Sequence, residues 1–236
     1  VLTYFALKGK VYKVFKSEEF KYYFFGTIGV TLLITFLIVN YQDPSLETSI
    51  QHAKTWGETE NAFRQASFSV VSVLTTTGFV SADFTKWNYM ITTIIFSLFF
   101  IGGSAGSTSG GIKIVRHIIM IKSSFYEFKK LLHPNAIIPV RYDGVSVPKT
   151  IIYNILSFFV LYMLIFIASS VLLTFLGLDF MSALGAAASS LGNVGPALGS
   201  LSPVDNYAHL TMPAKWTCSF LMLIGPRKIH VGSNVY

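Results

Sequence analysis

The chain has 236 residues, of which 52% are hydrophobic, 15% are aromatic and only 12% are charged. Soluble domains usually carry about 25% charged residues, so this composition excludes an ordinary soluble domain and indicates a protein whose main solvent is lipid. The net charge of +7 does not indicate nucleic-acid binding, because the basic residues are not interleaved with base-stacking aromatic residues. The single cysteine, Cys218, excludes an intrachain disulfide and a cysteine-rich metal cluster.

Apolar runs long enough to cross a bilayer occupy three ranges, 22–42, 87–112 and 150–178. A transmembrane helix needs about 20 apolar residues to cross the hydrocarbon core. The second run changes to glycine and serine from Gly102, and a fourth apolar run that begins at Trp216 is too short to span. We therefore expect a multi-pass membrane protein whose second and fourth helices are interrupted or incomplete.

Two further uncharged stretches, 65–82 and 180–204, are rich in alanine, serine, threonine and glycine. We expect each to be a re-entrant segment, in which a short helix enters the membrane and an irregular strand returns. Irregular backbone at membrane depth must be buried in protein or line a water-filled cavity, because an unpaired peptide group in lipid costs several kcal/mol.

These two stretches are related by a shift of 117 positions along the chain. The shift aligns Phe63 with Phe180, Ala66 with Ala183, Ser72 with Ser189, Leu74 with Leu191 and Gly78 with Gly195. The sequence therefore predicts an all-α membrane protein built from two tandem helix–pore loop–helix repeats, which is half of a four-repeat pore.

The charge distribution predicts the orientation of the chain. Lysines before the first apolar run and seven basic residues in 113–149 mark cytoplasmic segments, whereas 43–64 holds four acids and two bases and is expected outside. A solvated basic face without topological meaning is the alternative. The expected units are a cytoplasmic lead-in 1–21, a pore repeat 22–121 with a gate loop 102–113, a basic linker 122–149, a truncated pore repeat 150–225 and a divergent tail 226–236.

The candidate ion-binding motifs lie in the middle of the two re-entrant stretches. They read Thr75-Thr76-Thr77-Gly78-Phe79 and Gly192-Asn193-Val194-Gly195-Pro196. Backbone carbonyls can replace the hydration shell of an ion, and glycine tolerates the positive φ that pointing them at one axis requires. The absence of carboxylates in both motifs favours a monovalent over a divalent cation. Two ordinary helix C-caps are the alternative.

These motifs, together with the run 102–113 and the segments His133-Pro134-Asn135-Ala136 and Pro139-Val140-Arg141, resemble the Trk/Ktr/HKT superfamily of potassium-uptake transporters. The likeness is closest to the bacterial Trk membrane subunit and covers about residues 20–225, as the third and fourth of four repeats. The resemblance implies a potassium filter and an intramembrane gate loop. The filter residues would be Thr76, Thr77, Gly78, Asn193, Val194 and Gly195, and the gate glycines would be Gly102, Gly103, Gly106, Gly110 and Gly111.

Residue chemistry supports a mobile gate, because five glycines and four serines or threonines within 102–111 cannot form a firm helix. Close packing of helices against small residues is the alternative. A phosphate-binding loop is excluded, because Ile112 stands where that motif requires lysine. The family has a gate-facing arginine in its last helix, and Arg227 stands one position away from the expected place after an additional proline.

The resemblance implies potassium uptake across the bacterial inner membrane, with no enzymatic activity and no cofactor on this chain. The implied partners are the missing N-terminal half of the pore, a second copy of the full-length protein, a cytoplasmic NAD- or ATP-binding regulatory subunit of the Trk type, and the lipid bilayer. A sodium-conducting or non-selective member of the family is one alternative. A fragment that conducts only with the missing N-terminal half is the other.

Overall fold

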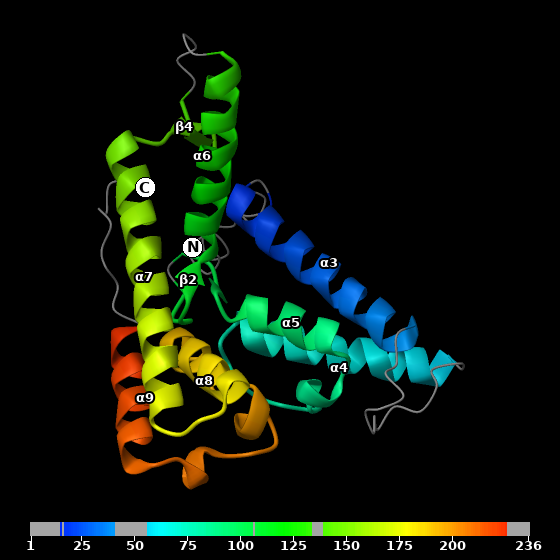
Figure 1. Ribbon diagram of the computed structural model, residues 1–236. Helices are drawn as coiled ribbons and strands as arrows, with labels where there is room; N and C mark the ends of the chain where they lie inside the picture. Colours follow the sequence, from blue (N-terminus) through cyan, green and yellow to red (C-terminus); the bar gives the residue numbers. More distant parts are fainter. Residues whose placement is uncertain (1–14, 16, 41–55, 106, 134–138, 226–236) are drawn as a thin grey trace.

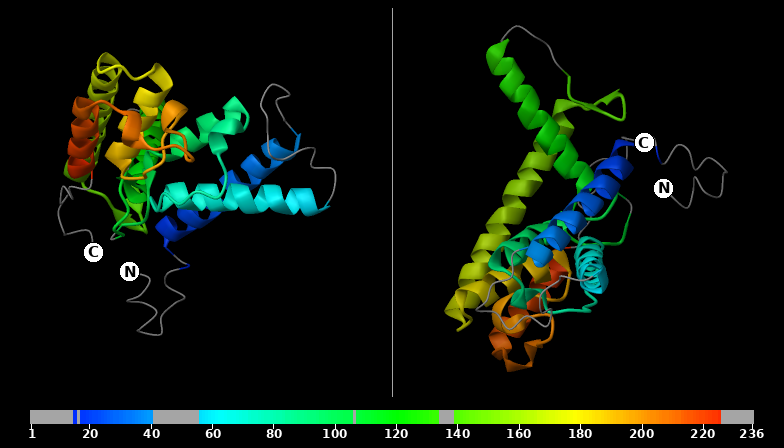
Figure 2. Two further views of the ribbon diagram at one scale, coloured as in Figure 1. Left: turned by 90° about the horizontal axis from the view of Figure 1, so that it is seen from below. Right: turned by 90° about the vertical axis from the view of Figure 1, so that its right-hand side faces the viewer.

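The computed structural model describes residues 15, 17–40, 56–105, 107–133 and 139–225. Their structure is mainly helical, as predicted, and each described strand has only two residues. In Figures 1 and 2, two helical units lie side by side. The first contains α3 (Glu18–Asn40), α4 (Trp56–Leu74), η1 (Phe84–Lys86) and α5 (Tyr89–Leu98), and the second contains α7 (Lys149–Phe175), α8 (Phe180–Gly192), η2 (Gly199–Leu201), η3 (Tyr207–His209) and α9 (Met212–Ile224).

Two of the described helices, α3 and α7, are long and apolar enough to cross a membrane. The run 87–112 does not form one spanning helix, because α5 ends at Leu98 after ten residues. Its glycine-rich second half forms β1 (Ile101–Gly102), a loop and β2 (Ile112–Lys113), and the chain then continues as α6 (Ile114–Leu132). Helix α6 continues across the predicted boundary between the first pore repeat, which ends at residue 121, and the basic linker, which begins at residue 122.

The short helix of the first re-entrant stretch begins earlier than predicted. Helix α4 begins at Trp56, whereas the uncharged stretch begins at residue 65. The difference arises because the first turns of α4 carry the charged residues Glu60 and Arg64, which a search for uncharged runs excludes. A helix can extend polar turns into water before its apolar part begins, so charge does not mark its start.

The two units share one core. Buried residues of α3, α4 and α5, among them Ile34, Val70 and Ile95, form a cluster that also contains Val194 and Leu198 from the second unit. Close approach of backbones explains the small residues of α8: a Cβ on Gly185 would lie 2.4 Å from the backbone nitrogen of Leu198. The returning chain therefore packs directly on the helix, which a larger side chain would prevent.

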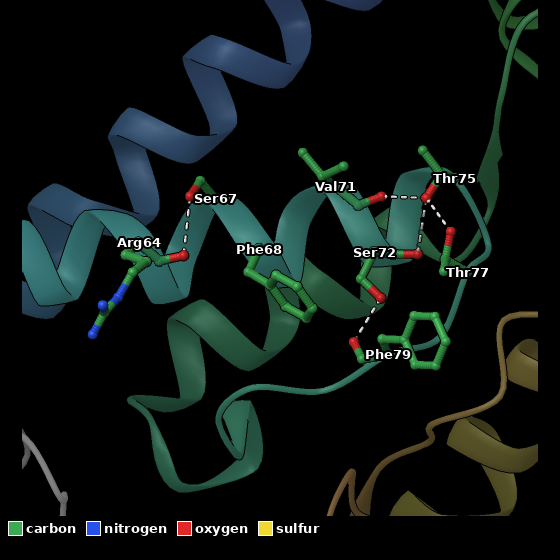
Figure 3. Close-up of a pocket in the computed structure, with 8 residues that line it drawn as sticks. All are labelled: Arg64, Ser67, Phe68, Val71, Ser72, Thr75, Thr77 and Phe79. Carbon is green, nitrogen blue, oxygen red and sulfur yellow. Dashed lines mark hydrogen bonds between the residues drawn. The ribbon is translucent and has the colours of Figure 1, made fainter.

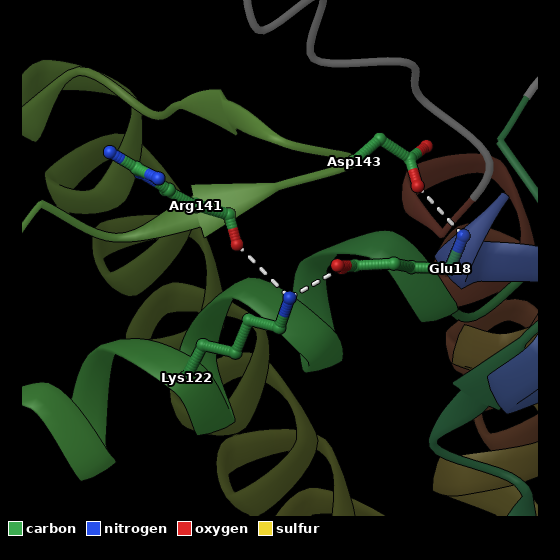
Figure 4. Close-up of polar contacts among 4 residues, drawn as sticks. All are labelled: Glu18, Lys122, Arg141 and Asp143. Atoms are coloured by element: carbon green, nitrogen blue, oxygen red, sulfur yellow. Dashed lines mark hydrogen bonds and ion pairs between the residues drawn. The ribbon is translucent and has the colours of Figure 1, made fainter.

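Polar contacts join the start of α3 to α6 and to the segment that connects α6 with α7 (Figure 4). This segment forms an antiparallel hairpin of β3 (Arg141–Tyr142) and β4 (Val145–Ser146). The ammonium of Lys122 pairs with the carboxylate of Glu18 and donates to the carbonyl of Arg141 at 3.0 Å. The backbone N–H of Glu18 donates to Asp143 Oδ1 at 2.7 Å. The start of α3 is thus joined to the segment that links the two repeats.

Candidate ion pathway

The first candidate filter loop leaves the C-terminus of α4 with two residues at positive φ. These are Thr76 at 53° and Gly78 at 74°. The N–H of Thr77, between them, donates to the carbonyl of Ser72 at 2.9 Å. The Ser72 hydroxyl donates to the carbonyl of Phe79 at 2.7 Å, so one serine of α4 contacts the loop on both sides of the glycine.

The second loop repeats this backbone pattern at the same shift of 117 positions. Asn193 has a φ of 52° and Gly195 a φ of 113°. The N–H of Val194 donates to the carbonyl of Ser189 at 3.0 Å, as Thr77 does to Ser72. The left-handed residue and this hydrogen bond form a common type of helix C-cap, and the second positive φ at Gly78 and Gly195 is a matched feature beyond that cap.

The sequence predicted positive φ at the glycines but missed it at Thr76 and Asn193. Asparagine tolerates the left-handed region, and its place at the end of α8 was a usable signal. A β-branched residue rarely adopts that conformation, and holding one there costs about 1–3 kcal/mol. Thr76 could therefore not be recognised from residue preference alone.

The structure brings the two loops into backbone contact. A Cβ on Gly78 would lie 2.1 Å from the carbonyl oxygen of Val194 and 3.3 Å from Cδ of Pro196. A Cβ on Gly195 would lie 4.0 Å from Cα of Gly78. The predicted filter residues of both repeats thus meet at one place, although 117 positions separate them in the chain.

A cavity of about 400 Å³ opens beside the first loop (Figure 3). The Thr75 and Thr77 hydroxyls lie 2.8 Å apart at one end of it, and both residues are exposed. Its apolar wall is formed by Phe68, Val71 and Phe79, and Arg64 lies at the other end, nearer the start of α4. The loop therefore presents hydroxyl oxygens to an open side of the molecule.

The predicted gate loop lies against both candidate filter loops. Parallel pairing of β1 with β2 closes it at its base, and Gly102 and Gly103 are buried there. The N–H of Gly110 donates to Thr76 Oγ1 at 3.0 Å. A Cβ on Gly110 would lie 1.9 Å from the carbonyl oxygen of Gly192, so only glycine fits this close approach.

The neighbouring Gly111 has a φ of 68° and would place a Cβ 3.3 Å from Cα of Gly102. Gly102, Gly110 and Gly111 therefore lie at one tight crossing of backbone, whereas Gly103 faces the side chains of Ser107 and Ser109. The fifth predicted gate glycine, Gly106, lies outside the described residues.

Two charged side chains that the sequence analysis missed hold the gate loop. The Lys113 ammonium donates to the carbonyls of Ser107 at 3.0 Å and Ser109 at 2.5 Å, and to both hydroxyls at 3.1 Å. The carboxylate of Glu19, at the start of α3, accepts from the N–H of Ala105. Lys113 comes directly after the glycine-serine run, and this position in the sequence was the signal that could have identified it as a partner of the loop.

The last described helix reaches the second loop. The side-chain amide of Asn193 donates to the carbonyl of Met222 at 3.1 Å. A Cβ on Gly225 would lie 2.0 Å from the carbonyl oxygen of Leu191. Arg227, the predicted partner of the gate, lies outside the described residues.

The available ligands along this pathway are backbone carbonyls and hydroxyls. Across the part of the chain that the structure describes, no group of three or more histidine, cysteine, aspartate or glutamate side chains could hold a metal ion. Carbonyl and hydroxyl dipoles suit a weakly hydrated monovalent cation, which needs many oxygens and no fixed charge.

Comparison with known proteins gives one consistent result. Residues 22–230 match the family model TrkH, described as a cation transport protein. The Trk system potassium uptake protein TrkH of Halomonas elongata is 39% identical over 172 residues, which cover 73% of this chain and 35% of the relative. The protein of the same name from Salmonella typhimurium is 32% identical over 229 residues, covering 95% of this chain and 44% of the relative.

The crystal structure of the potassium transporter TrkH from Vibrio parahaemolyticus is also similar, with a TM-score of 0.81 and 30% sequence identity. That likeness covers 95% of this chain and 45% of the solved one. The chain thus spans less than half the length of these relatives, and the predicted helical membrane-transporter fold is confirmed. With its family model matched from residue 22 to residue 230, the chain belongs to the TrkH family of cation transport proteins.

Proposed function

We propose that this chain is half of a potassium-uptake pore in the bacterial plasma membrane, with several membrane passes and no enzymatic activity. The observation that carries the proposal is the contact of Gly78 with the Val194 carbonyl, between two loops that share one pattern of dihedral angles. Such paired loops can present carbonyl oxygens from two sides to one ion.

In this proposal Thr76, Thr77 and Gly78 form one quarter of the filter, and Asn193, Val194 and Gly195 form another. Potassium loses part of its hydration shell to these oxygens and then enters a water-filled vestibule. The membrane potential drives it inward, with about 2.3 kcal/mol per charge for each 100 mV.

The loop of residues 102–113 is the proposed gate beneath the filter. Its support is the hydrogen bond from Gly110 to Thr76 and the cage of oxygens around the Lys113 ammonium. Opening requires the loop to leave the filter, and the glycines supply the backbone freedom for that movement. Arg227 is proposed as a further electrostatic barrier to the ion.

Two loops supply two quarters of a four-sided filter, so the proposed pore needs an N-terminal half that contributes the other two. The further proposed partners are a second copy of the full-length subunit and a cytoplasmic NAD- or ATP-binding regulatory subunit of the Trk type. The regulatory subunit would dock on the basic side, where Lys122, Lys129 and Lys130 lie on α6.

Complementation of a bacterial strain that lacks potassium uptake tests this function. One culture expresses residues 1–236 alone, and another expresses a completed subunit with the N-terminal half of a TrkH relative placed before residue 1. We expect growth at low potassium only with the completed subunit. Growth with residues 1–236 alone would overturn the half-pore assignment, and no growth with either protein would count against potassium uptake.

The same strain separates potassium from sodium transport. Rubidium uptake that exceeds sodium uptake through the completed subunit supports a potassium pore. Equal uptake of the two ions, or greater uptake of sodium, would instead favour the sodium-conducting or non-selective alternative.

A further inference from the structure

Two side chains, one before and one after the second loop in the chain, hold both backbone polar groups of Gly195. The N–H of Gly195 donates to the hydroxyl of Ser189 at 3.0 Å. The phenol of Tyr207 donates to the carbonyl of Gly195 at 2.8 Å. Ser189 is fully buried within α8, whereas Tyr207 begins η3, beyond the loop. The peptide groups of this residue are therefore fixed in direction by two separate elements.

Tyr207 is itself firmly placed. Its ring packs against the buried cluster that contains Leu210 and Cys218. The Asn206 side chain accepts from the N–H of Ala208 at 2.9 Å and so caps η3, which carries the tyrosine. Burial raises the pKa of Tyr207 to about 12, so its hydroxyl keeps its proton and donates at physiological pH.

The first loop has a different arrangement at the matching place. Phe84 begins η1 as Tyr207 begins η3, each after a residue whose side chain caps the short helix, and Phe84 offers no hydroxyl. In that loop, the Ser72 hydroxyl donates to the carbonyl of Phe79, one residue beyond the glycine. The phenol contact thus distinguishes two loops that otherwise share their backbone pattern.

We propose that Tyr207 is a positioning residue that fixes the Gly195 carbonyl and thereby increases the preference of the filter for potassium over sodium. This inference rests on the proposed role of Gly195 in the filter. Sodium is smaller than potassium, so the oxygens must move inward to coordinate it, and a carbonyl oxygen that accepts a hydrogen bond from a packed phenol resists that movement. The hydrogen bond also draws electron density from the oxygen, and a weaker field at the ligands favours the larger, less strongly hydrated ion.

Tyr207→Phe in the completed subunit tests this inference, because it removes the hydroxyl and keeps the ring. Rubidium and sodium uptake are measured in the same potassium-uptake-deficient cells. We expect the rubidium-to-sodium ratio to fall about fivefold, the factor that corresponds to one net hydrogen bond. The matched control is Tyr89→Phe, because Tyr89 is 67% exposed at the start of α5.

The uptake ratio does not depend on the amount of folded protein, so a purely structural role for Tyr207 would lower both rates and leave the ratio unchanged. An unchanged ratio in Tyr207→Phe, with measurable rubidium uptake in the unsubstituted subunit, overturns the inference and leaves the proposed function standing. Absence of rubidium uptake in the unsubstituted subunit would instead overturn the proposed function.

Discussion

The backbone N–H of Gly110 donates a hydrogen bond of 3.0 Å to the side-chain oxygen of Thr76. Thr76 lies in a candidate filter loop and Gly110 in the candidate gate loop, so this bond joins the two parts of the proposed pathway. The backbone of Gly110 also passes so close to Gly192 that a Cβ would lie 1.9 Å from the Gly192 carbonyl oxygen. Both filter loops therefore contact the same residue of the gate loop.

Thr76→Val tests the link between filter and gate. Valine keeps the branched shape and removes the acceptor for the Gly110 N–H, so we expect the gate loop to leave the filter more often. Rubidium uptake through the completed subunit should rise about fivefold, in proportion to the loss of one net hydrogen bond. Thr76→Ser keeps the hydroxyl and serves as the control. Equal uptake in the two variants would show that this bond does not hold the gate closed.

Lys113→Met tests the cage within the gate loop. Methionine has a similar length but no ammonium, so the carbonyls of Ser107 and Ser109 lose a charged donor. We expect the free energy of unfolding to fall by about 1–3 kcal/mol and basal rubidium uptake to rise. Lys86→Met, in η1, is the matched control. A loss of stability without any change in uptake would assign Lys113 to folding alone.

The ion pair between Glu18 and Lys122 should stabilise the fold without affecting transport. Its side chains are 32% and 22% exposed, so solvent screens the attraction. A double-mutant cycle with Glu18→Gln and Lys122→Met should give a coupling free energy of about 0.5–1 kcal/mol in thermal unfolding. Rubidium uptake should stay within error of the unsubstituted protein. A large fall in uptake would mean that this contact takes part in gating.

Asp179 should make the stability of the second repeat sensitive to acid. The Asp179 carboxylate caps α8 by accepting from Ser182, and this hydrogen bonding lowers its pKa below the usual value. A carboxyl whose folded-state pKa is lowered stabilises the fold above its unfolded pKa and loses that effect as pH falls through the folded value. Thermal unfolding measured as the pH falls from about 5 to about 2 should show this loss.

Asp179→Asn keeps an N-cap acceptor but carries no charge, so it should flatten the acid dependence. Asp179→Ala should cost about 1 kcal/mol near neutral pH, because the cap is lost. If the thermal stability of Asp179→Asn fell as steeply with pH as that of the unsubstituted protein, the acid sensitivity would belong to another carboxyl group.

Much of this architecture could be predicted from the sequence, because lipid imposes strong rules on composition. The apolar runs predicted α3 and α7, and the shift of 117 positions predicted the places of both loops. The start of α4 was predicted too far along the chain because its first turns are polar. Water can solvate the first turns of a helix that later enters the membrane.

The parts that could not be predicted depend on contacts between distant segments. Thr76 adopts a left-handed conformation that its own side chain disfavours, so neighbouring structure must hold it. Lys113 directly follows the glycine-serine run, where a lysine is expected to mark a cytoplasmic segment. Its ammonium instead donates to a carbonyl of the loop. Tyr207 contacts Gly195 across 12 positions in a segment without helical periodicity. Local sequence pattern contains no signal for the conformation of Thr76 or for the contact of Tyr207.

The most direct test of the proposed filter is rubidium uptake through the completed subunit with Gly78→Ala, compared with Gly29→Ala. A Cβ at residue 78 would lie 2.1 Å from the Val194 carbonyl oxygen, at a φ of 74° that alanine tolerates poorly. A Cβ at residue 29 would meet no atom within 4 Å. We predict that Gly78→Ala abolishes rubidium uptake or its preference over sodium, while Gly29→Ala leaves both unchanged. Unaltered uptake and selectivity in Gly78→Ala would contradict the assignment of these loops as the filter.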